Sequence, residues 1–214
     1  MAIYNNSILK INEEIARALP YSGLVIDLGC GTAPYKSFIL DKADRYIGVD
    51  WGQSLHSDSE VDVVADLCET LPFEDDYADT VCSFQVVEHL REPDFFISEC
   101  FRILKPGGSL FLTSPFMWQV HEAPFDFFRY TRFGLEHLLK KNGFTKLQVE
   151  ATTGYWHTSA LKFNYHSLRY SRGILRYFWI PIWFLNQPFA AMIDKIDFDP
   201  TETASYKTTA VKPG

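Results

Sequence analysis

One short segment limits the fold of this chain more than any other. Residues 25–32 read VIDLGCGT, an apolar run with an acid at Asp27, followed by Gly29 and Gly31 with one residue between them. Such a run is typical of a buried strand, and the glycines allow backbone amides to approach a ligand just before the next helix begins. A ligand held in this way lies at the carboxyl edge of a parallel sheet, so the segment predicts a doubly wound α/β fold.

The rest of the first 150 residues supports this prediction, because apolar runs alternate there with helix-like stretches. The predicted strands are residues 24–28, 46–49, 61–65, 79–84, 109–113, 144–151 and 204–211. Predicted helices cover residues 7–18, a stretch from 34 onward, 94–104 and 131–141, with 105–108 as a turn. Ser7 and Thr131 are expected to be N-caps. A length of 214 residues suits a single domain.

The ligand at the glycine segment is expected to carry a positive charge. A dinucleotide-binding fingerprint requires a third glycine at the position of Pro34. Asp27 would repel a pyrophosphate, whereas it suits an ammonium or a sulfonium group. Asp50 follows Gly31 by 19 residues, which is the spacing of a carboxylate that holds ribose hydroxyls. These features favour a cationic nucleoside over NAD or FAD.

Taken in order, these motifs resemble those of class I S-adenosylmethionine-dependent methyltransferases. They are most similar to the small-molecule (type 11) branch, which contains the ubiquinone and menaquinone methyltransferases. The resemblance covers about residues 20–151 and rests on VIDLGCGT at 25–32, YIGVD at 46–50, VVADL at 63–67, the stretch 79–90 that ends in FQVVEHL, and FRILKPGG at 101–108. It implies a Rossmann-like, mostly parallel sheet of seven strands in the order 3-2-1-4-5-7-6, with strand seven antiparallel. The implied cofactor is S-adenosylmethionine, released as S-adenosylhomocysteine.

The resemblance also implies which residues hold the cofactor. In the family, an acid after the second strand binds the ribose, an acid and an amide after the third hold the adenine, and residues after the fourth lie beside the sulfonium. The positions that match are Asp27, Gly29, Cys30, Gly31, Asp50, Trp51, Asp66, Leu67, Gln85 and Val86. Cys30 is expected to be a small residue beside the ligand without a redox role.

Acceptor-side residues are expected in the long aromatic segment PFMWQVHEAPFDFFRYT at 115–131, because long loops in compact domains are often functional. His121 is the hypothesis for a general base, since imidazole titrates near neutral pH, and a purely structural histidine is the alternative. Asp126 and Arg129 are expected to form an ion pair. The further acceptor-side candidates are His89 and Tyr130, although His89 is equally suited to packing under the cofactor. No metal site is apparent, because the four cysteines lack zinc-site spacing.

An insertion, residues 152–203, separates the sixth and seventh predicted strands within the single domain 1–214. No acidic residue lies between Glu150 and Asp194, and the 17 residues YFWIPIWFLNQPFAAMI at 177–193 are uncharged. A membrane span needs ~20 apolar residues, so spanning is not expected. Three interpretations remain open for residues 155–198: a helical lid over the acceptor site, a homodimer interface, or contact with a membrane surface.

The expected function is methyl transfer to a small molecule, with a hydroxyl of a sugar, a lipid-linked glycan or a phenol as the first candidate. The net charge of −7 argues against nucleic acid as the acceptor, and the Asn/Asp-Pro-Pro-aromatic step of nucleic-acid methyltransferases is missing after the fourth strand. A non-catalytic cofactor-binding module is the alternative. The first residues lack a secretory signal, so a cytoplasmic location is expected, with contact at the inner membrane surface as the variant.

Overall fold

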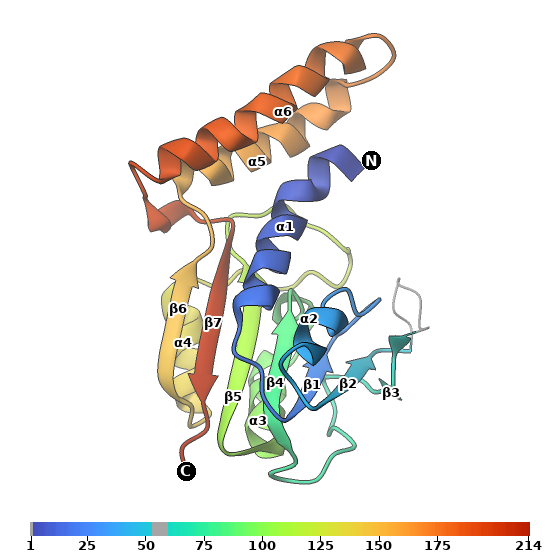
Figure 1. Cartoon of the computed structure of the whole chain (residues 1–214), viewed down its shortest axis with the longest axis vertical. Helices are drawn as coiled ribbons and strands as arrows, with labels where there is room; N and C mark the ends of the chain where they lie inside the picture. The colour runs from blue at the N-terminus through green and yellow to red at the C-terminus, as the bar shows by residue number, and fades with distance from the viewer. Residues whose placement is uncertain (1, 53–59) are drawn as a thin grey trace.

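A computed structural model describes residues 2–52 and 60–214, and the side chains of residues 10–52 and 60–214. These residues form one sheet of seven strands in the order β3-β2-β1-β4-β5-β7-β6, which confirms the predicted order (Figure 1). The strands are β1 (Leu24–Leu28), β2 (Arg45–Asp50), β3 (Val63–Val64), β4 (Ala78–Phe84), β5 (Leu104–Pro115), β6 (Thr145–Ala151) and β7 (Ser205–Val211). Strand β7 runs antiparallel to both of its neighbours, β5 and β6. Strands β1 to β5 run parallel to one another, so their carboxyl ends meet at one edge of the sheet.

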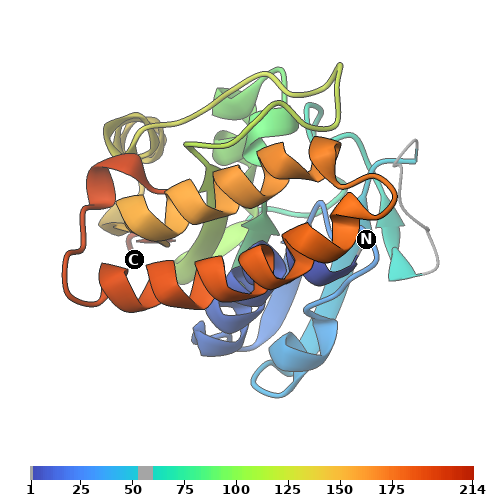
Figure 2. The same ribbon diagram turned by 90° about the horizontal axis from the view of Figure 1, so that it is seen from above.

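Helices cover both faces of this sheet (Figures 1 and 2). One layer contains α1 (Ala2–Ala18) and α2 (Lys36–Leu40), and the other contains α3 (Pro93–Ile103) and α4 (Arg132–Lys141). Because successive side chains of a strand face opposite sides, Val25 packs with the α1 and α2 layer while Ile26 packs with the α3 and α4 layer. The core thus consists of two apolar layers that hold β1 in the middle of the sheet.

Two predicted boundaries are wrong, and one predicted cap is confirmed. Helix α1 begins at Ala2, so Ser7 lies inside it and is no N-cap, because no proline or glycine interrupts the first residues. The predicted turn 105–108 belongs to β5, where the chain bulges and Gly107 bonds back to Lys212. Thr131 does cap α4, since its hydroxyl accepts a hydrogen bond from the amide of Gly134 at 3.1 Å.

The insertion forms a helical hairpin, α5 (Tyr155–Ser167) and α6 (Leu175–Asp194), which lies above the carboxyl edge of the sheet (Figures 1 and 2). Asp194 closes its base, because the carboxylate accepts from the amides of Gly154 and Trp156 at 2.8 and 3.1 Å and so caps α5. Along the hairpin, Asn186 donates to Asn164 at 2.9 Å. Among the described residues, no helix combines the length and the apolar character that a membrane span requires.

Candidate active site

The glycine loop after β1 is held by the ends of its two neighbouring strands. The amides of Gly29 and Cys30 donate to the carbonyl of Val49 at 2.8 and 3.0 Å. Gly29 has a φ of 79°, and a Cβ there would approach Val86, at the end of β4, to 2.4 Å. Only glycine satisfies both conditions. The sequence segment therefore folds into the tight turn that was predicted.

Two partly buried carboxylates lie at the carboxyl ends of strands β2 and β3, and the first of them contacts this loop. Asp50 accepts from the amide of Gly31 with one oxygen and from that of Trp51 with the other, both at 2.6 Å. Asp66, after β3, accepts from the amide of Cys68 at 2.8 Å. Each bonded oxygen of Asp50 retains a lone pair for a ligand hydroxyl. The structure therefore brings Asp50 and Asp66 to adjacent strand ends, with Asp50 bonded to the glycine loop.

Asp27 lies under the loop rather than facing outward. Its side chain is on the α1 and α2 side of β1, with 2% of the residue exposed, and its carboxylate accepts from the Tyr46 hydroxyl at 2.8 Å. Burial raises the pKa of Asp27 to about 6, while the hydrogen bonds from Tyr46 and Cys82 oppose this rise. Asp27, which the sequence predicts as a cofactor contact, has its side chain in the core below the loop, because side chains alternate along β1.

Gln85 follows β4 in a backbone conformation that is unusual for its side chain. Its φ is 57°, and its amide nitrogen donates to the carbonyl of Thr113 at 3.0 Å. The buried side-chain nitrogen Nε2 has no hydrogen-bond partner in the described part of the chain. A non-glycine residue held at positive φ is a mark of functional sites.

A cavity of about 320 Å³ opens next to Gln85. Its walls come from α1, the ends of β4 and β5, the start of β7, helix α5 and the segment 116–131, which is the part of the predicted loop 115–131 that follows β5. The lining residues are Ile11, Asn12, Gln85, His89, Pro115, Trp118, Gln119, His121, Glu122, Thr152, Tyr165, Ala204 and Ser205. The rings of Trp118 and Tyr165 meet at a centroid distance of 4.8 Å, which joins the segment 116–131 to α5. The cavity therefore lies between the sheet edge and the helical hairpin.

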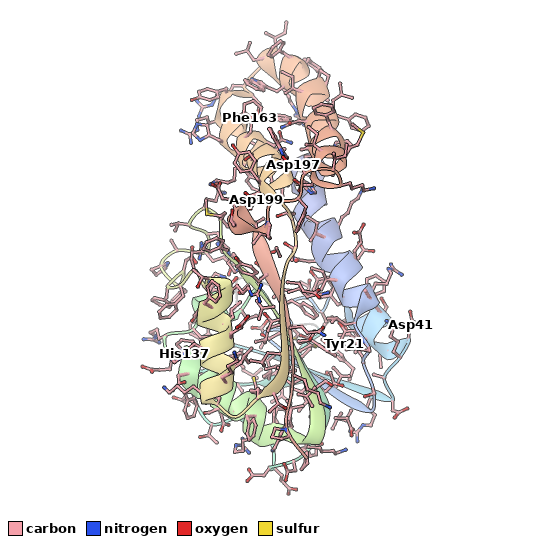
Figure 3. The ribbon with its side chains drawn as sticks, turned by 90° about the vertical axis from the view of Figure 1, so that its left-hand side faces the viewer. Tyr21, Asp41, His137, Phe163, Asp197 and Asp199 are labelled. Carbon is pink, nitrogen blue, oxygen red and sulfur yellow. The ribbon has the colours of Figure 1, made fainter. Side chains whose placement is uncertain are left out.

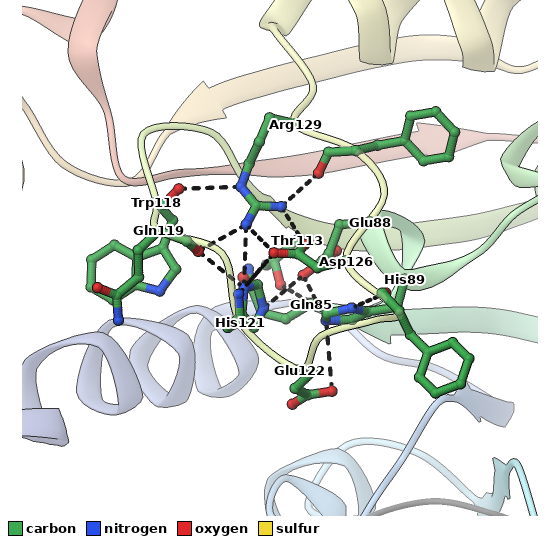
Figure 4. A network of polar contacts seen from close by, with 12 residues as sticks. Gln85, Glu88, His89, Thr113, Trp118, Gln119, His121, Glu122, Asp126 and Arg129 are labelled. Carbon is green, nitrogen blue, oxygen red and sulfur yellow. Dashed lines mark hydrogen bonds and ion pairs between the residues drawn. The ribbon is translucent and has the colours of Figure 1, made fainter.

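Arg129 fixes the shape of the segment 116–131 (Figure 4). Its guanidinium donates to both carboxylate oxygens of Asp126, which confirms the predicted ion pair, and to the carbonyl of Gln119 at 2.9 Å. These hydrogen bonds hold the pKa of Asp126 at about 2. Asp126 in turn accepts from the amide of His121 at 2.8 Å. The pair thus positions the backbone that carries His121.

Three ionisable side chains meet at the cavity wall. His89 Nε2 and His121 Nε2 lie 3.7 and 3.9 Å from Glu88 Oε1, and the two imidazole rings are 4.8 Å apart. Burial raises the pKa of Glu88 to about 8, and burial together with His89 lowers the pKa of His121. Both oxygens of Glu88 lack a hydrogen-bond partner within the described residues. Tyr130 lies nearby with a buried hydroxyl, and burial together with the Glu88 charge raises its pKa.

The acceptor-side residues predicted from the sequence are His89, His121, Asp126, Arg129 and Tyr130, and Glu88 is not among them. Glu88 follows the apolar residues Val86 and Val87 and stands next to His89, so an acid paired with a histidine in a mostly apolar stretch is the available signal. Glu122, Trp118 and Tyr165 are also missed, because their approach depends on how the segment 116–131 and the hairpin fold.

The sheet order, the glycine loop and the carboxylate at the end of β2 define a Rossmann-like methyltransferase fold. Comparison with known families agrees: residues 26–112 match the Methyltransferase domain family Methyltransf_11. Residues 26–112 therefore carry a methyltransferase domain of the type 11 branch of the class I S-adenosylmethionine-dependent methyltransferases. The cofactor of this family is S-adenosylmethionine.

Relatives by sequence include a protein of Mycolicibacterium smegmatis named probable S-adenosylmethionine-dependent methyltransferase, which is 32% identical over 148 residues, or 64% of this chain and 56% of the relative. The ubiquinone biosynthesis O-methyltransferase of Chelativorans sp. is 27% identical over 122 residues, or 52% of this chain and 48% of the relative. The chain therefore spans about half the length of these relatives.

Solved structures share the fold. The Haemonchus contortus phosphoethanolamine N-methyltransferase 2, in complex with S-adenosylhomocysteine, has a TM-score of 0.60 at 20% identity, covering 98% of this chain and 53% of that one. The [4+2]-cyclase SpnF has a TM-score of 0.63 at 21% identity, covering 95% and 81%. At such identities the likeness shows the fold alone.

Proposed function

We propose that this chain transfers the methyl group of S-adenosylmethionine to a hydroxyl of a small molecule. A sugar, a lipid-linked glycan and a phenol are the first candidates for the acceptor. The observation that carries the proposal is the cavity of about 320 Å³, which starts at Gln85 beside the glycine loop and carries His89 and His121 on its wall. Its volume and its few convergent polar groups suit a small acceptor.

In this proposal the cofactor lies along the carboxyl ends of β1 to β4. Asp50 accepts the ribose hydroxyls, and Asp66 with the amide of Leu67 holds the adenine. The glycine loop at 29–31 faces the amino-acid part, with Asp27 supporting the loop from below. The remaining cofactor contacts that we assign are Cys30, Trp51, Gln85 and Val86. Both Asp50 oxygens are already oriented by backbone amides, which supports this assignment.

His121 is proposed as the group that accepts the hydroxyl proton. Its Nε2 faces the Glu88 and His89 cluster, and its main chain is fixed by Asp126. His121→Ala is expected to lower the rate of methyl transfer by about 100-fold while binding of S-adenosylhomocysteine stays intact. A wild-type rate in this variant would remove His121 as the base.

The first experiment is calorimetric titration with S-adenosylhomocysteine, followed by a screen of candidate hydroxyl acceptors with a labelled methyl donor. The [4+2]-cyclase with the same fold shows that the fold does not require methyl transfer. Single-turnover release of the labelled methyl group separates an enzyme from a module that only binds the cofactor. Cofactor binding without transfer to any acceptor would favour the binding module.

We propose that the insertion 152–203 is a lid of the single domain 1–214. Tyr165 of α5 lines the cavity and contacts Trp118 of the segment 116–131, so the hairpin forms part of the roof. Deletion of residues 155–198 is expected to abolish acceptor turnover and to spare binding of S-adenosylhomocysteine. Full acceptor turnover after this deletion would contradict the lid.

The outer face of the hairpin supports a second proposal, contact with an anionic membrane surface. Ile174, Tyr177 and Phe184 are 83%, 75% and 71% exposed. The other exposed apolar side chains of α6 are Leu175, Phe178, Leu185, Phe189 and Met192. Arg172 and Arg176 flank the tip, and the segment from residue 151 to 193 contains no acid. Apolar side chains bordered by arginines match the interface of anionic lipid.

Flotation with phosphatidylserine-containing vesicles tests this contact. Binding is expected to weaken with salt and to fall in Ile174→Asp. Phe133→Asp is the matched control, because Phe133 is 74% exposed but lies on α4. Failure to float, together with dimerisation that Ile174→Asp disrupts, would assign this face to a homodimer instead.

A further inference from the structure

Glu88, His89 and His121 bring three ligand-type groups to one point. One donor atom from each lies within 4.8 Å of the others, and the shortest of these distances are the 3.7 and 3.9 Å between the Nε2 atoms and Glu88 Oε1 (Figure 4). Ligands of a tetrahedral zinc ion lie roughly 3.3 Å from one another, given bonds of about 2.0–2.1 Å. Small side-chain rotations therefore suffice to place all three groups on one ion.

The hydrogen bond of His89 directs its free nitrogen into this cluster. His89 Nδ1 lies 2.7 Å from the carbonyl oxygen of Phe125 and must donate to it, because a carbonyl only accepts. Nε2 is then unprotonated in the neutral ring and faces Glu88. Metal-binding histidines are typically oriented by such a bond from the opposite ring nitrogen.

His121 is placed in a similar way. Its Nδ1 lies 3.3 Å from the carbonyl of Gln119 and 3.5 Å from the carboxylate of Asp126, while Arg129 Nη2 is also 3.3 Å away. With the ring proton on Nδ1, the Gln119 carbonyl accepts it and Nε2 is free to coordinate, whereas with the proton on Nε2 the Nδ1 atom accepts from Arg129 instead. The Asp126 carboxylate then occupies the outer position that commonly supports a ligand histidine.

Glu88 supplies an independent observation. The residue is 0% exposed, yet neither carboxylate oxygen has a hydrogen-bond partner among the residues described. A buried carboxylate without partners is unfavourable unless a cation or donor meets it in the functional state. Glu122 lies at the edge of the cluster, since its Oε2 is 3.8 Å from His89 Nε2 and its side chain is 47% exposed.

We infer that Glu88, His89 and His121 bind a divalent transition-metal ion, such as Zn²⁺ or Mn²⁺, which holds the acceptor oxygen next to the methyl donor. Two imidazoles with one carboxylate suit these ions better than Mg²⁺ or Ca²⁺, which favour oxygen ligands. Three protein ligands leave a coordination position for the acceptor. This inference rests on the proposed acceptor site and deepens it.

The ion would make the bound hydroxyl more acidic, so that its proton passes to water. The oxygen then attacks the methyl carbon. The new O–CH₃ bond forms while the S–CH₃ bond breaks, and the electron pair of the broken bond remains on sulfur. The ion keeps its oxidation state throughout. With the ion bound, the lone pair of His121 Nε2 is engaged by it, so His121 acts as a ligand, and the role of base proposed above applies to the metal-free chain.

The test is metal binding to the full chain, without acceptor. Protein stripped with a chelator is titrated with Zn²⁺ by calorimetry and with Mn²⁺ by loss of the free-ion paramagnetic resonance signal. We expect one ion per chain, and an affinity at least about tenfold lower in Glu88→Gln, His89→Ala and His121→Ala. His89→Gln replaces His89→Ala if the smaller side chain prevents folding, as judged by thermal unfolding.

His137→Ala is the matched control, because His137 is an exposed histidine outside the cluster. It lies on α4, far from the hairpin that carries Phe163 (Figure 3). Equal affinity in His89→Ala, His121→Ala and the control, or no binding by the wild-type chain, would overturn the inference. Titration with S-adenosylhomocysteine on the same samples separates the two proposals. Cofactor binding without metal binding overturns the metal site alone, and metal binding without cofactor binding overturns the proposed function alone.

Discussion

Two neighbouring regions of the same sheet edge are built differently. The half that we assign to the cofactor (the cofactor half), at the ends of β1, β2 and β3, is internally satisfied: Asp50 accepts from two amides, and Asp27 accepts from Tyr46. The acceptor half comprises the ends of β4 and β5 with the segment 116–131. It leaves Gln85 Nε2 and both oxygens of Glu88 without partners in the described chain. One half is preorganised, and the other retains polar groups that a bound species must satisfy.

The largest expected effect is in the cofactor half. Asp50→Ala removes the carboxylate that orders Gly31 and that we assign to the ribose, so the affinity for S-adenosylhomocysteine should fall by about 100-fold. Calorimetry measures this change. Asp41→Ala, at the exposed end of α2, should bind normally. Unchanged affinity in Asp50→Ala would show that the preorganised half holds no cofactor.

In the acceptor half, Asp126→Ala should lower the free energy of unfolding by about 2–3 kcal/mol. The side chain of Asp126 is 2% exposed, and its loss leaves Arg129 and the amide of His121 without their acceptor. Urea unfolding measures the loss, and Glu150→Ala, on the surface of β6, is the control. A loss no greater than that of the control would mean that the Asp126–Arg129 pair does not hold the segment.

The buried acid of the cofactor half predicts a pH effect. Because burial raises the pKa of Asp27 to about 6, the folded chain binds more protons than the unfolded chain between pH 4 and pH 6. The stabilising contribution is therefore present at low pH and declines as pH rises, by about 2 kcal/mol over this range. Asp27→Asn should remove this component from the difference between urea unfolding curves at the two pH values. An Asp27→Asn profile parallel to that of the wild type would contradict the raised pKa.

The smallest effect has the opposite sign. Glu88→Met should stabilise the metal-free chain by about 1 kcal/mol, because an apolar side chain of similar size replaces a buried carboxylate without partners. Thermal unfolding after chelation measures it. Glu99→Met is the contrasting variant, since Glu99 is bonded to Arg102 and Leu71 and its replacement should destabilise. Destabilisation of similar size in both variants would show that Glu88 is as well satisfied in the fold as Glu99.

The sequence predicted the cofactor half more fully than the acceptor half, for a physical reason. The glycine loop and Asp50 are set by strand ends and by a spacing along the chain, so local patterns locate them. Glu88 and His121 are 33 positions apart, and Arg129 and Asp126 shape the segment 116–131 that brings His121 to Glu88. The hairpin was predicted as an insertion, but its roof position depends on the contact of Tyr165 with Trp118, which no local pattern encodes.

The cap that Asp194 places on α5 has a mechanical consequence. Since the last residue of α6 is bonded to the first turn of α5, the two helices are tied at their common base. In the proposed lid, movement of the hairpin relative to the sheet would therefore take place in the connecting segments 151–154 and 199–204. The outer surface of the hairpin and its inner surface over the cavity would then move together. A partner bound to the outer surface would therefore also set the opening of the proposed lid.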